Sequence, residues 1–194
     1  MLKINRKKDE RVVHACTNNC ADIPNGVTVN STELVAGSVL KEGSALAKDA
    51  STGLYHVCKT ALVVENVSNS DTDIKVAKGS QFKVGEYVMA KAGAKAYAIS
   101  EIDKSNAAYD KITVGTTLGI AISKGESIQQ AAAGSSSTTS ALKYVPTALT
   151  GDSYDVDGLS NVAVVAVTIG QFKESIIPPV SADMKKTLTG IVFI

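Results

Sequence analysis

The chain has no tryptophan, and aromatic residues make up only 5% of its 194 positions. Ligand pockets are usually lined by aromatic and other large apolar side chains, so this scarcity argues against a site for a large aromatic ligand. Charge is balanced, because 20 Lys and Arg stand against 19 Asp and Glu and leave a net charge of +1. No overall charge therefore draws the protein to nucleic acid or to anionic lipid, and we expect no nucleic acid and no membrane as partner.

Long hydrophobic segments are missing as well. The longest apolar run, Val162 to Val167, has six residues, whereas a membrane-spanning helix needs roughly 20. The charged start, MLKINRKKDERVV, leads into polar residues rather than an apolar stretch of about 7 to 15 residues, so we expect no secretory signal and synthesis in the cytosol. Three cysteines, Cys16, Cys20 and Cys58, cannot all pair with one another, which favours free thiols in a reducing compartment.

Common catalytic motifs are absent too. The sequence contains no GxSxG, HExxH, GxxxxGK[ST] or GxGxxG motif, the signatures of widespread hydrolase, metalloprotease, phosphate-binding and dinucleotide-binding classes. The only two histidines are His14 and His56, and no spacing around them indicates a hydrolytic triad. We therefore expect a protein that is not an enzyme and that uses no cofactor.

The chain does contain a repeated pattern that is typical of β-strands separated by turns: short β-branched or alternating runs are interrupted by Gly, Asn, Asp and Ser. Gly85 and Gly125 predict tight turns, because glycine adopts positive φ at little cost. Residues 128–133 fit either the end of a strand or one helical turn. The expected strands are 54–59, 61–66, 74–76, 81–84, 87–90, 96–102, 111–114 and 118–122.

Neither face of residues 96–102 is uniformly apolar, which suits a thin barrel or sandwich, or one whose outer face meets another subunit. Residues 162–172 form the strongest predicted strand, apolar on both sides and hence expected to be buried on both. Ser181 predicts the N-cap of a short helix over 182–188, and residues 191–194 predict a terminal strand. The expected oligomer interface consists of Val162, Val165, Val167, Ile169 and Phe172.

Composition changes at residues 134–140, seven small polar or glycine residues that indicate a flexible Ser-rich linker. We therefore expect a mainly β protein: an extended N-terminal arm (1–24), a small β-barrel or sandwich domain (25–133), the linker, and a smaller α+β oligomerisation domain (141–194).

The histidines and cysteines fall in two short clusters, His14-x-Cys16 with Cys20, and His56-x-Cys58. Positions i and i+2 of a strand share a face, so each pair could offer two ligands to a tetrahedral zinc ion. The spacings match no standard zinc finger, and the alternative is an ordinary buried Cys58 on a strand with the rest in an irregular arm. We favour that alternative and assign no metal site; a zinc-dependent or thiol enzyme would depend wholly on these clusters.

The first 12 residues carry five basic and two acidic side chains. Such a segment can be a solvated terminus, or it can dock onto a larger assembly by charge and strand addition. The residues that would carry this docking are Leu2, Lys3, Ile4, Arg6, Lys7, Lys8 and Arg11.

Three stretches resemble a known family: residues 96–119, 120–133 and 144–194. Their most specific marks are the run ISEIDKSNAAYDKITVGTTLGIAI and the segment IGQFKES with the following PPV, a short helix and a terminal strand. They are similar to head fiber and capsid decoration proteins of tailed bacteriophages, particularly Bacteroides-type, crAss-like phages. The similarity extends from about Lys41 onward, and residues 37–55 also resemble the start of small phage decoration proteins. Residues before Pro24, including His14, Cys16 and Cys20, match nothing in that family.

The resemblance implies a non-enzymatic virion protein on the capsid exterior, present in the host cytoplasm during assembly. Its partners would be the major capsid protein, or other capsid proteins, and further copies of itself, which a cyclic trimer could join in a closed way. The alternative is a carbohydrate-binding or adhesive module that touches host-surface glycans. Six tyrosines and no tryptophan are a thin supply of the aromatic side chains that bind glycans.

Overall fold

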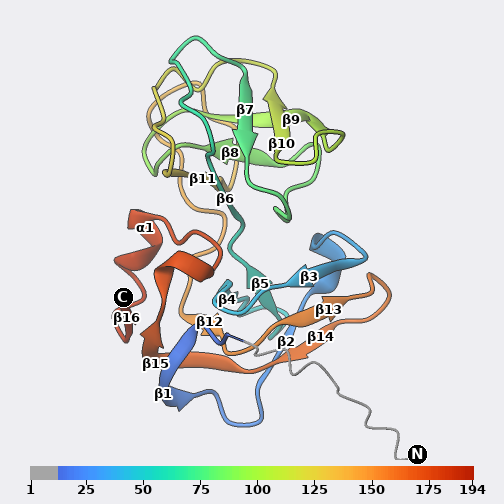
Figure 1. Cartoon of the computed structure of the whole chain (residues 1–194), viewed down its shortest axis with the longest axis vertical. Helices are drawn as coiled ribbons and strands as arrows, with labels where there is room; N and C mark the ends of the chain where they lie inside the picture. Colours follow the sequence, from blue (N-terminus) through green and yellow to red (C-terminus); the bar gives the residue numbers. More distant parts are fainter. Residues whose placement is uncertain (1–12) are drawn as a thin grey trace, which may run out of the picture.

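The computed structural model describes residues 13–194, which form two β lobes stacked along the long axis of the molecule (Figure 1). We call residues 13–58 together with 143–194 the terminal lobe, and residues 59–142 the middle lobe. The expectation of a mainly β protein is confirmed. Within the described residues the helical segments are α1 (Ala182–Lys185) and two 3-10 turns, η1 (Ser31–Glu33) and η2 (Glu174–Ile176). None of the helices in that range is long and apolar enough to cross a bilayer.

The terminal lobe combines strands from both ends of the chain. Its main sheet has the order β1-β15-β12-β4-β5-β2-β14, with β16 parallel to β15, and β3 pairs with β13 in a separate ribbon. The early strands are β1 (Cys16–Asp22), β2 (Val27–Val29), β3 (Ser38–Leu40), β4 (Ala45–Lys48) and β5 (Tyr55–Val57). The late strands are β12 (Ala148–Thr150), β13 (Tyr154–Val156), β14 (Val162–Val164), β15 (Ala166–Phe172) and β16 (Ile191–Phe193).

This sheet curls back on itself. Only Val165 separates β14 from β15 in the chain, although β14 ends the strand order and β15 lies near its other end. Successive residues of a strand point to opposite faces, and both faces of the central strands are covered. Leu46 packs in one apolar cluster, whereas Ala47 packs in a second cluster that includes Met184 of α1.

The middle lobe is a second curled sheet, with the order β6-β11-β8-β9-β10-β7. A bridge between Val63 and Val76 joins its two ends, so the sheet encloses a core that includes Ile74, Ile99 and Ile128. Its strands are β6 (Thr60–Leu62), β7 (Asp73–Val76), β8 (Tyr87–Met89), β9 (Ala96–Asp103), β10 (Asp110–Val114) and β11 (Ser127–Gln130).

The strand pairing differs from the domain division expected from the sequence. Residues 25–57, grouped there with the middle of the chain, pair instead with the C-terminal part: β4 pairs with β12, and β2 with β14. Residues 141–194 therefore share a sheet with the N-terminal part rather than forming a separate domain. Local pattern does not reveal such pairings, because they join segments about a hundred residues apart in sequence.

The expected arm and linker also differ from the structure where they are described. Residues 16–22 form β1, paired antiparallel with β15, so the expected arm ends in a strand of the sheet. Residues 134–140 fold against the middle lobe: the Ser135 and Ala96 backbones exchange hydrogen bonds, and the Ser140 hydroxyl donates to Ala94 O. These small polar residues predict a linker, but in the structure their hydroxyl groups form hydrogen bonds within a turn, as between Ser135 Oγ and Ser137 O.

Several local predictions are confirmed. Ser181 caps α1, its hydroxyl accepting a hydrogen bond from the Met184 N–H, although α1 is shorter than expected. Gly85 and Gly125 have φ of 88° and 93°. Residues 81–84 and 118–122 do not form strands, although Ile122 makes a single β-bridge with Val67, and the undecided segment 128–133 contributes to β11.

Candidate assembly surface and lobe junction

The expected oligomer interface divides into buried and exposed members. Val167 and Phe172 are 1% and 0% exposed and belong to the core of the terminal lobe. Val165 and Ile169 are 39% and 50% exposed, and Val162 is half-buried against the core. The expectation that residues 162–172 are buried on both sides is therefore wrong, because Val165 and Ile169 are exposed.

An exposed apolar strip continues from Ile169 onto the neighbouring strand β16. Gln171 pairs with Val192 in the parallel ladder, so Ile169, two residues before Gln171, lies on the same face as Val192. Ile194 follows at the next position of that face. Val192 and Ile194 are 57% and 54% exposed. We call Ile169, Val192 and Ile194 the outer strip.

The first group of zinc candidates surrounds a carboxylate. Glu42 accepts hydrogen bonds from the Ala15 and Cys16 backbone N–H groups, and His14 Nδ1 lies 3.6 Å from its carboxylate. Cys20 is exposed further along β1. Burial and the charge of Glu42 raise the pKa of the Cys16 thiol, which keeps it protonated at neutral pH.

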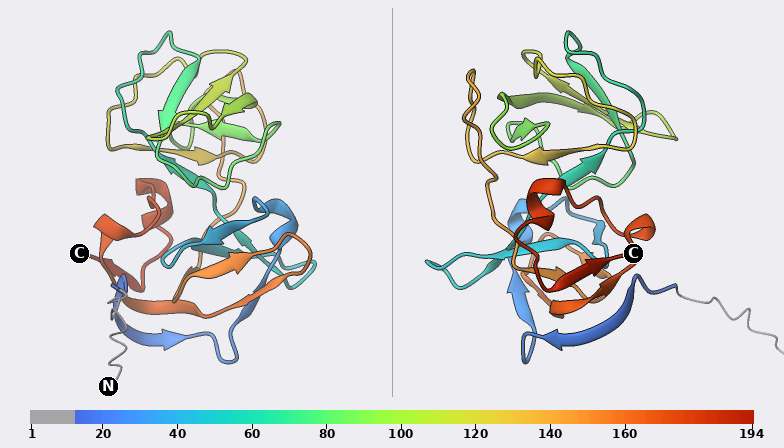
Figure 2. Two further views of the ribbon diagram at one scale, coloured as in Figure 1. Left: turned by 45° about the vertical axis from the view of Figure 1, so that its right-hand side comes forward. Right: turned by 90° about the vertical axis from the view of Figure 1, so that its left-hand side faces the viewer.

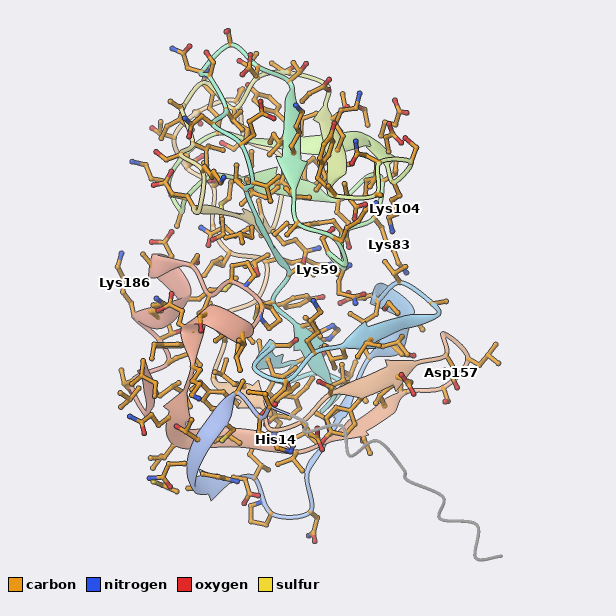
Figure 3. All side chains as sticks on the ribbon, viewed as in Figure 1. His14, Lys59, Lys83, Lys104, Asp157 and Lys186 are labelled. Atoms are coloured by element: carbon orange, nitrogen blue, oxygen red, sulfur yellow. The ribbon has the colours of Figure 1, made fainter. Side chains whose placement is uncertain are left out.

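The second group lies elsewhere in the lobe, on and just after β5. His56 Nδ1 donates a hydrogen bond to the Glu33 carboxylate at 2.8 Å, and the His56 ring stacks on Tyr144 with centroids 4.4 Å apart. Cys58 is buried, its Sγ lies 3.5 Å from Tyr144 O, and burial raises the pKa of its thiol. In Figure 3, His14 lies low in the terminal lobe while Lys59, next to Cys58, lies at the junction of the lobes.

The two groups are therefore not brought together. Across residues 13–194 no three His, Cys, Asp or Glu side chains are placed to hold a metal ion. The other candidate residues of the arm, Leu2, Lys3, Ile4, Arg6, Lys7, Lys8 and Arg11, lie outside the described residues.

A buried cation occupies the point where the chain passes from one lobe to the other. Lys59 is 1% exposed, and its Nζ donates to Glu86 in the middle lobe and to the backbone oxygen of Glu33 in the terminal lobe. Glu86 also accepts from the Lys83 N–H, and Lys83 Nζ donates to Thr32 O. Burial lowers the pKa of Lys59, whereas the hydrogen bond and charge of Glu86 oppose that shift.

Glu33 is the centre of the terminal-lobe side of this junction. Its carboxylate lies 2.7 Å from the Tyr144 hydroxyl, which donates to it, and 3.3 Å from Lys143 Nζ. Burial would raise the pKa of Glu33, but the hydrogen bonds from His56 and Tyr144 outweigh it and hold the pKa below its usual range. Glu33 is therefore ionised at neutral pH. The same contacts and burial raise the pKa of Tyr144.

Helix α1 provides a further contact between the lobes. Asp183 accepts hydrogen bonds from the Ala92 N–H at 2.8 Å and from Gln129 Nε2 at 2.9 Å, both in the middle lobe. Figure 2 shows α1 against the underside of that lobe. Burial opposes ionisation of Asp183, but these bonds and Lys186 lower its pKa.

Sequence reasoning missed the junction residues Glu33, Lys59 and Glu86 and two members of the outer strip. The signal for Lys59 is its place within the apolar run HVCKTALVV, where a lysine needs a partner. The signal for Val192 and Ile194 is their alternation in IVFI, which puts both on one face.

Comparison of the chain with protein-family models, with curated proteins and with solved structures found no match. The surfaces described above are therefore interpreted from their own chemistry.

Proposed function

We propose that the protein is a non-enzymatic structural component of a phage virion, a head fiber or decoration protein attached to the outside of the capsid. Copies of the chain associate through the outer strip, in a closed ring of three, and the basic N-terminal segment attaches each copy to the major capsid protein. The resemblance of residues 96–133 and 144–194 to phage head fiber proteins supports this proposal.

The outer strip is the observation that carries the proposal. It places three large apolar side chains, each about half exposed, on one face of two paired strands. Contiguous apolar surface of this kind marks a protein contact. In a closed ring of three, the three strips would meet around the threefold axis, so that each is covered and no end is left open.

Attachment through a short basic segment is physically sufficient in such a ring. Three arms bound to one shell act together, so the assembly holds firmly even where each contact is weak. The described chain enters β1 beside β15, the strand that carries Ile169, so arm and outer strip belong to neighbouring strands of one sheet.

Co-sedimentation with capsids that lack this protein tests the proposal. We expect the full chain to sediment with the capsids and a variant lacking Met1 to Arg11 to remain in the supernatant while keeping its fold. Loss of the arm removes five basic side chains, so raising the salt concentration should weaken binding of the full chain as well. A full chain that does not sediment contradicts the proposal, and undiminished binding of the truncated variant rejects the arm as the anchor.

A carbohydrate-binding role is the second candidate, favoured by a shallow hollow on the middle lobe. The hollow has a volume of about 370 Å³ and is lined by Tyr87, Tyr97, Thr116, Gly134 and Ser135. Tyr87 is exposed, and aromatic rings beside hydroxyl groups suit a sugar ring. Binding on a glycan array that Tyr87→Ala abolishes would support this role, and an array without signal would exclude it.

A further inference from the structure

A cleft of about 260 Å³ lies between the two lobes. Its lower wall comes from β3 and its upper wall from β6 and the turn at residues 77–81. Residues 175–179, which we call the strap, close one end. In Figure 1 this is the region below the green loop that hangs from β7 toward β3.

Exposed apolar side chains converge on this cleft from three separate elements. Val39 of β3, Leu62 of β6 and Ile176 of the strap are each at least 37% exposed, and all three line it. Single exposed apolar residues are ordinary on a protein surface, but three that face one hollow mark a contact site. Pro178 and Pro179 add further apolar wall.

The walls of the cleft are held in place. Gly43 has φ of 79°, and a Cβ at that position would collide with the Ile177 side chain, so glycine is needed for the strap to pack there. On the other side, Gln81 accepts from the Val35 N–H at 2.9 Å and donates to Ser38 Oγ at 2.9 Å, which ties the turn to the terminal lobe. A rigid hollow loses little entropy when it is filled.

Two polar groups in the cleft lack partners among residues 13–194. The Ser80 hydroxyl oxygen is buried and makes no hydrogen bond there. Lys41, which also lines the cleft, forms no ion pair with a described carboxylate, and its ammonium lies beside Gly79 in the same turn. The other lining lysines are occupied, because Lys59 pairs with Glu86 and Lys78 with Asp110.

We propose that this cleft binds an extended segment of a partner protein in which apolar side chains flank a carboxylate. The apolar side chains would cover Val39, Leu62 and Ile176, and the carboxylate would accept hydrogen bonds from Lys41 and from the Ser80 hydroxyl. No acidic side chain lines the cleft within the described part of the chain, so the charge complementarity favours an acidic segment. It disfavours residues 1–12, whose five basic side chains would meet Lys41. This inference is independent of the capsid proposal.

The probe is a pair of capped peptides, acetyl-Val-Leu-Asp-Leu-amide and the same peptide with Lys in place of Asp, titrated into the full chain labelled with ¹⁵N. We expect the acidic peptide to cause saturable amide shifts at Lys41, Leu62, Ser80 and Ile176. The lysine peptide should bind about tenfold more weakly or not at all. Equal binding of both peptides, or shifts spread over other surfaces, would overturn the proposal.

Two variants separate binding from folding. Lys41→Glu should weaken the acidic peptide by about threefold to fivefold, the range of a partly exposed ion pair, while Lys48→Glu, an exposed lysine outside the cleft, should leave it unchanged. Ser80→Ala should weaken binding by about threefold yet leave the urea midpoint unchanged or higher, because it removes a buried hydroxyl without a partner. If neither Lys41→Glu nor Ser80→Ala alters the affinity, the carboxylate is not bound there.

Other occupants are distinguished in the same spectra. If deletion of residues 1–12 shifts the cleft amides, the cleft holds the chain's own arm, and the proposal is wrong. If dodecanoate binds more strongly than the peptide and shifts the same amides, the ligand of the cleft is a free fatty acid rather than a partner segment, and the proposal is likewise wrong.

Discussion

Lys59 Nζ lies 2.5 Å from Oε1 of Glu86, and the lysine is almost wholly buried where the chain enters the middle lobe. The same ammonium donates to Glu33 O in the terminal lobe, so one cation is shared between both lobes. A buried charge is costly unless it is paired and hydrogen-bonded. This pair is therefore one of the contacts whose loss should weaken the junction of the lobes.

Replacement of Lys59 tests that dependence. Lys59→Met should lower the free energy of unfolding by about 3 kcal/mol, because Glu86 is left largely buried without its cation. Urea denaturation followed by circular dichroism measures the change. The double variant Lys59→Met with Glu86→Leu should lose less than Lys59→Met alone.

Lys75→Met is the matched control for this experiment. Lys75 also pairs with a glutamate, Glu65, but both side chains are exposed, so the loss should stay below about 1 kcal/mol. Equal losses at the two sites would show that burial of Lys59 has no energetic consequence.

Acid should weaken the junction. The pKa values of Glu33 and Asp183 lie below the usual carboxyl values in the folded protein. As the pH falls through the ordinary carboxyl range, the unfolded chain takes up protons before the folded one, so stability is complete above about pH 5 and declines below it. Urea midpoints at several pH values between 7 and 3 measure this.

The variant Asp183→Asn measures how much of the stability lost in acid is due to Asp183 of α1. Its amide oxygen still accepts from the Ala92 N–H but no longer titrates, so the variant should lose less stability between pH 5 and pH 3 than the wild type. An unchanged pH profile would mean that Asp183 does not contribute to acid sensitivity.

Charge placed on the exposed apolar positions should separate subunits without unfolding them. Ile169→Asp and Val192→Asp change side chains of the outer strip that are at least half exposed, so we expect folded monomers by light scattering, in place of a wild-type mass three times that of one chain. Val167→Asp, buried in the same strand as Ile169, should cost about 4 kcal/mol or more and prevent folding. If both exposed variants keep the wild-type mass, the oligomer forms through another surface.

Protein purified without chelator should contain no stoichiometric zinc. The candidate zinc ligands form two separate groups. His14, Cys16 and Cys20 belong to the group around Glu42, whereas His56 and Cys58 contact Glu33 and Tyr144. Elemental analysis measures the content. One zinc per chain would contradict this expectation and would return the His and Cys clusters to consideration.

Local structure could be predicted where a single residue determines it. Ser181 caps α1 because a serine hydroxyl accepts from a backbone N–H in the first turn, and Gly85 and Gly125 turn because glycine tolerates positive φ. The apolar character of residues 162–172 predicts an interface that contains both Val167 and Ile169. Of these two side chains, Ile169 is exposed and Val167 is buried in the core.

Long-range pairing could not be predicted in the same way. Nothing near Leu46 indicates that β4 pairs with Ala148 in β12, because each strand is only three or four residues long and similar in composition to many others. The junction could not be predicted for the same reason, because Glu33, Lys59 and Glu86 meet only after both sheets have closed. In the sequence, only the apolar residues around Lys59 indicate that this lysine needs a partner.

Quantitative mass spectrometry of density-purified phage particles tests the central claim most directly, by comparing the copy number of this protein with that of the major capsid protein. The proposal predicts a fixed ratio that matches a set of symmetry-related sites on the shell, with a multiple of three copies at each site. Absence of the protein from purified particles would contradict it.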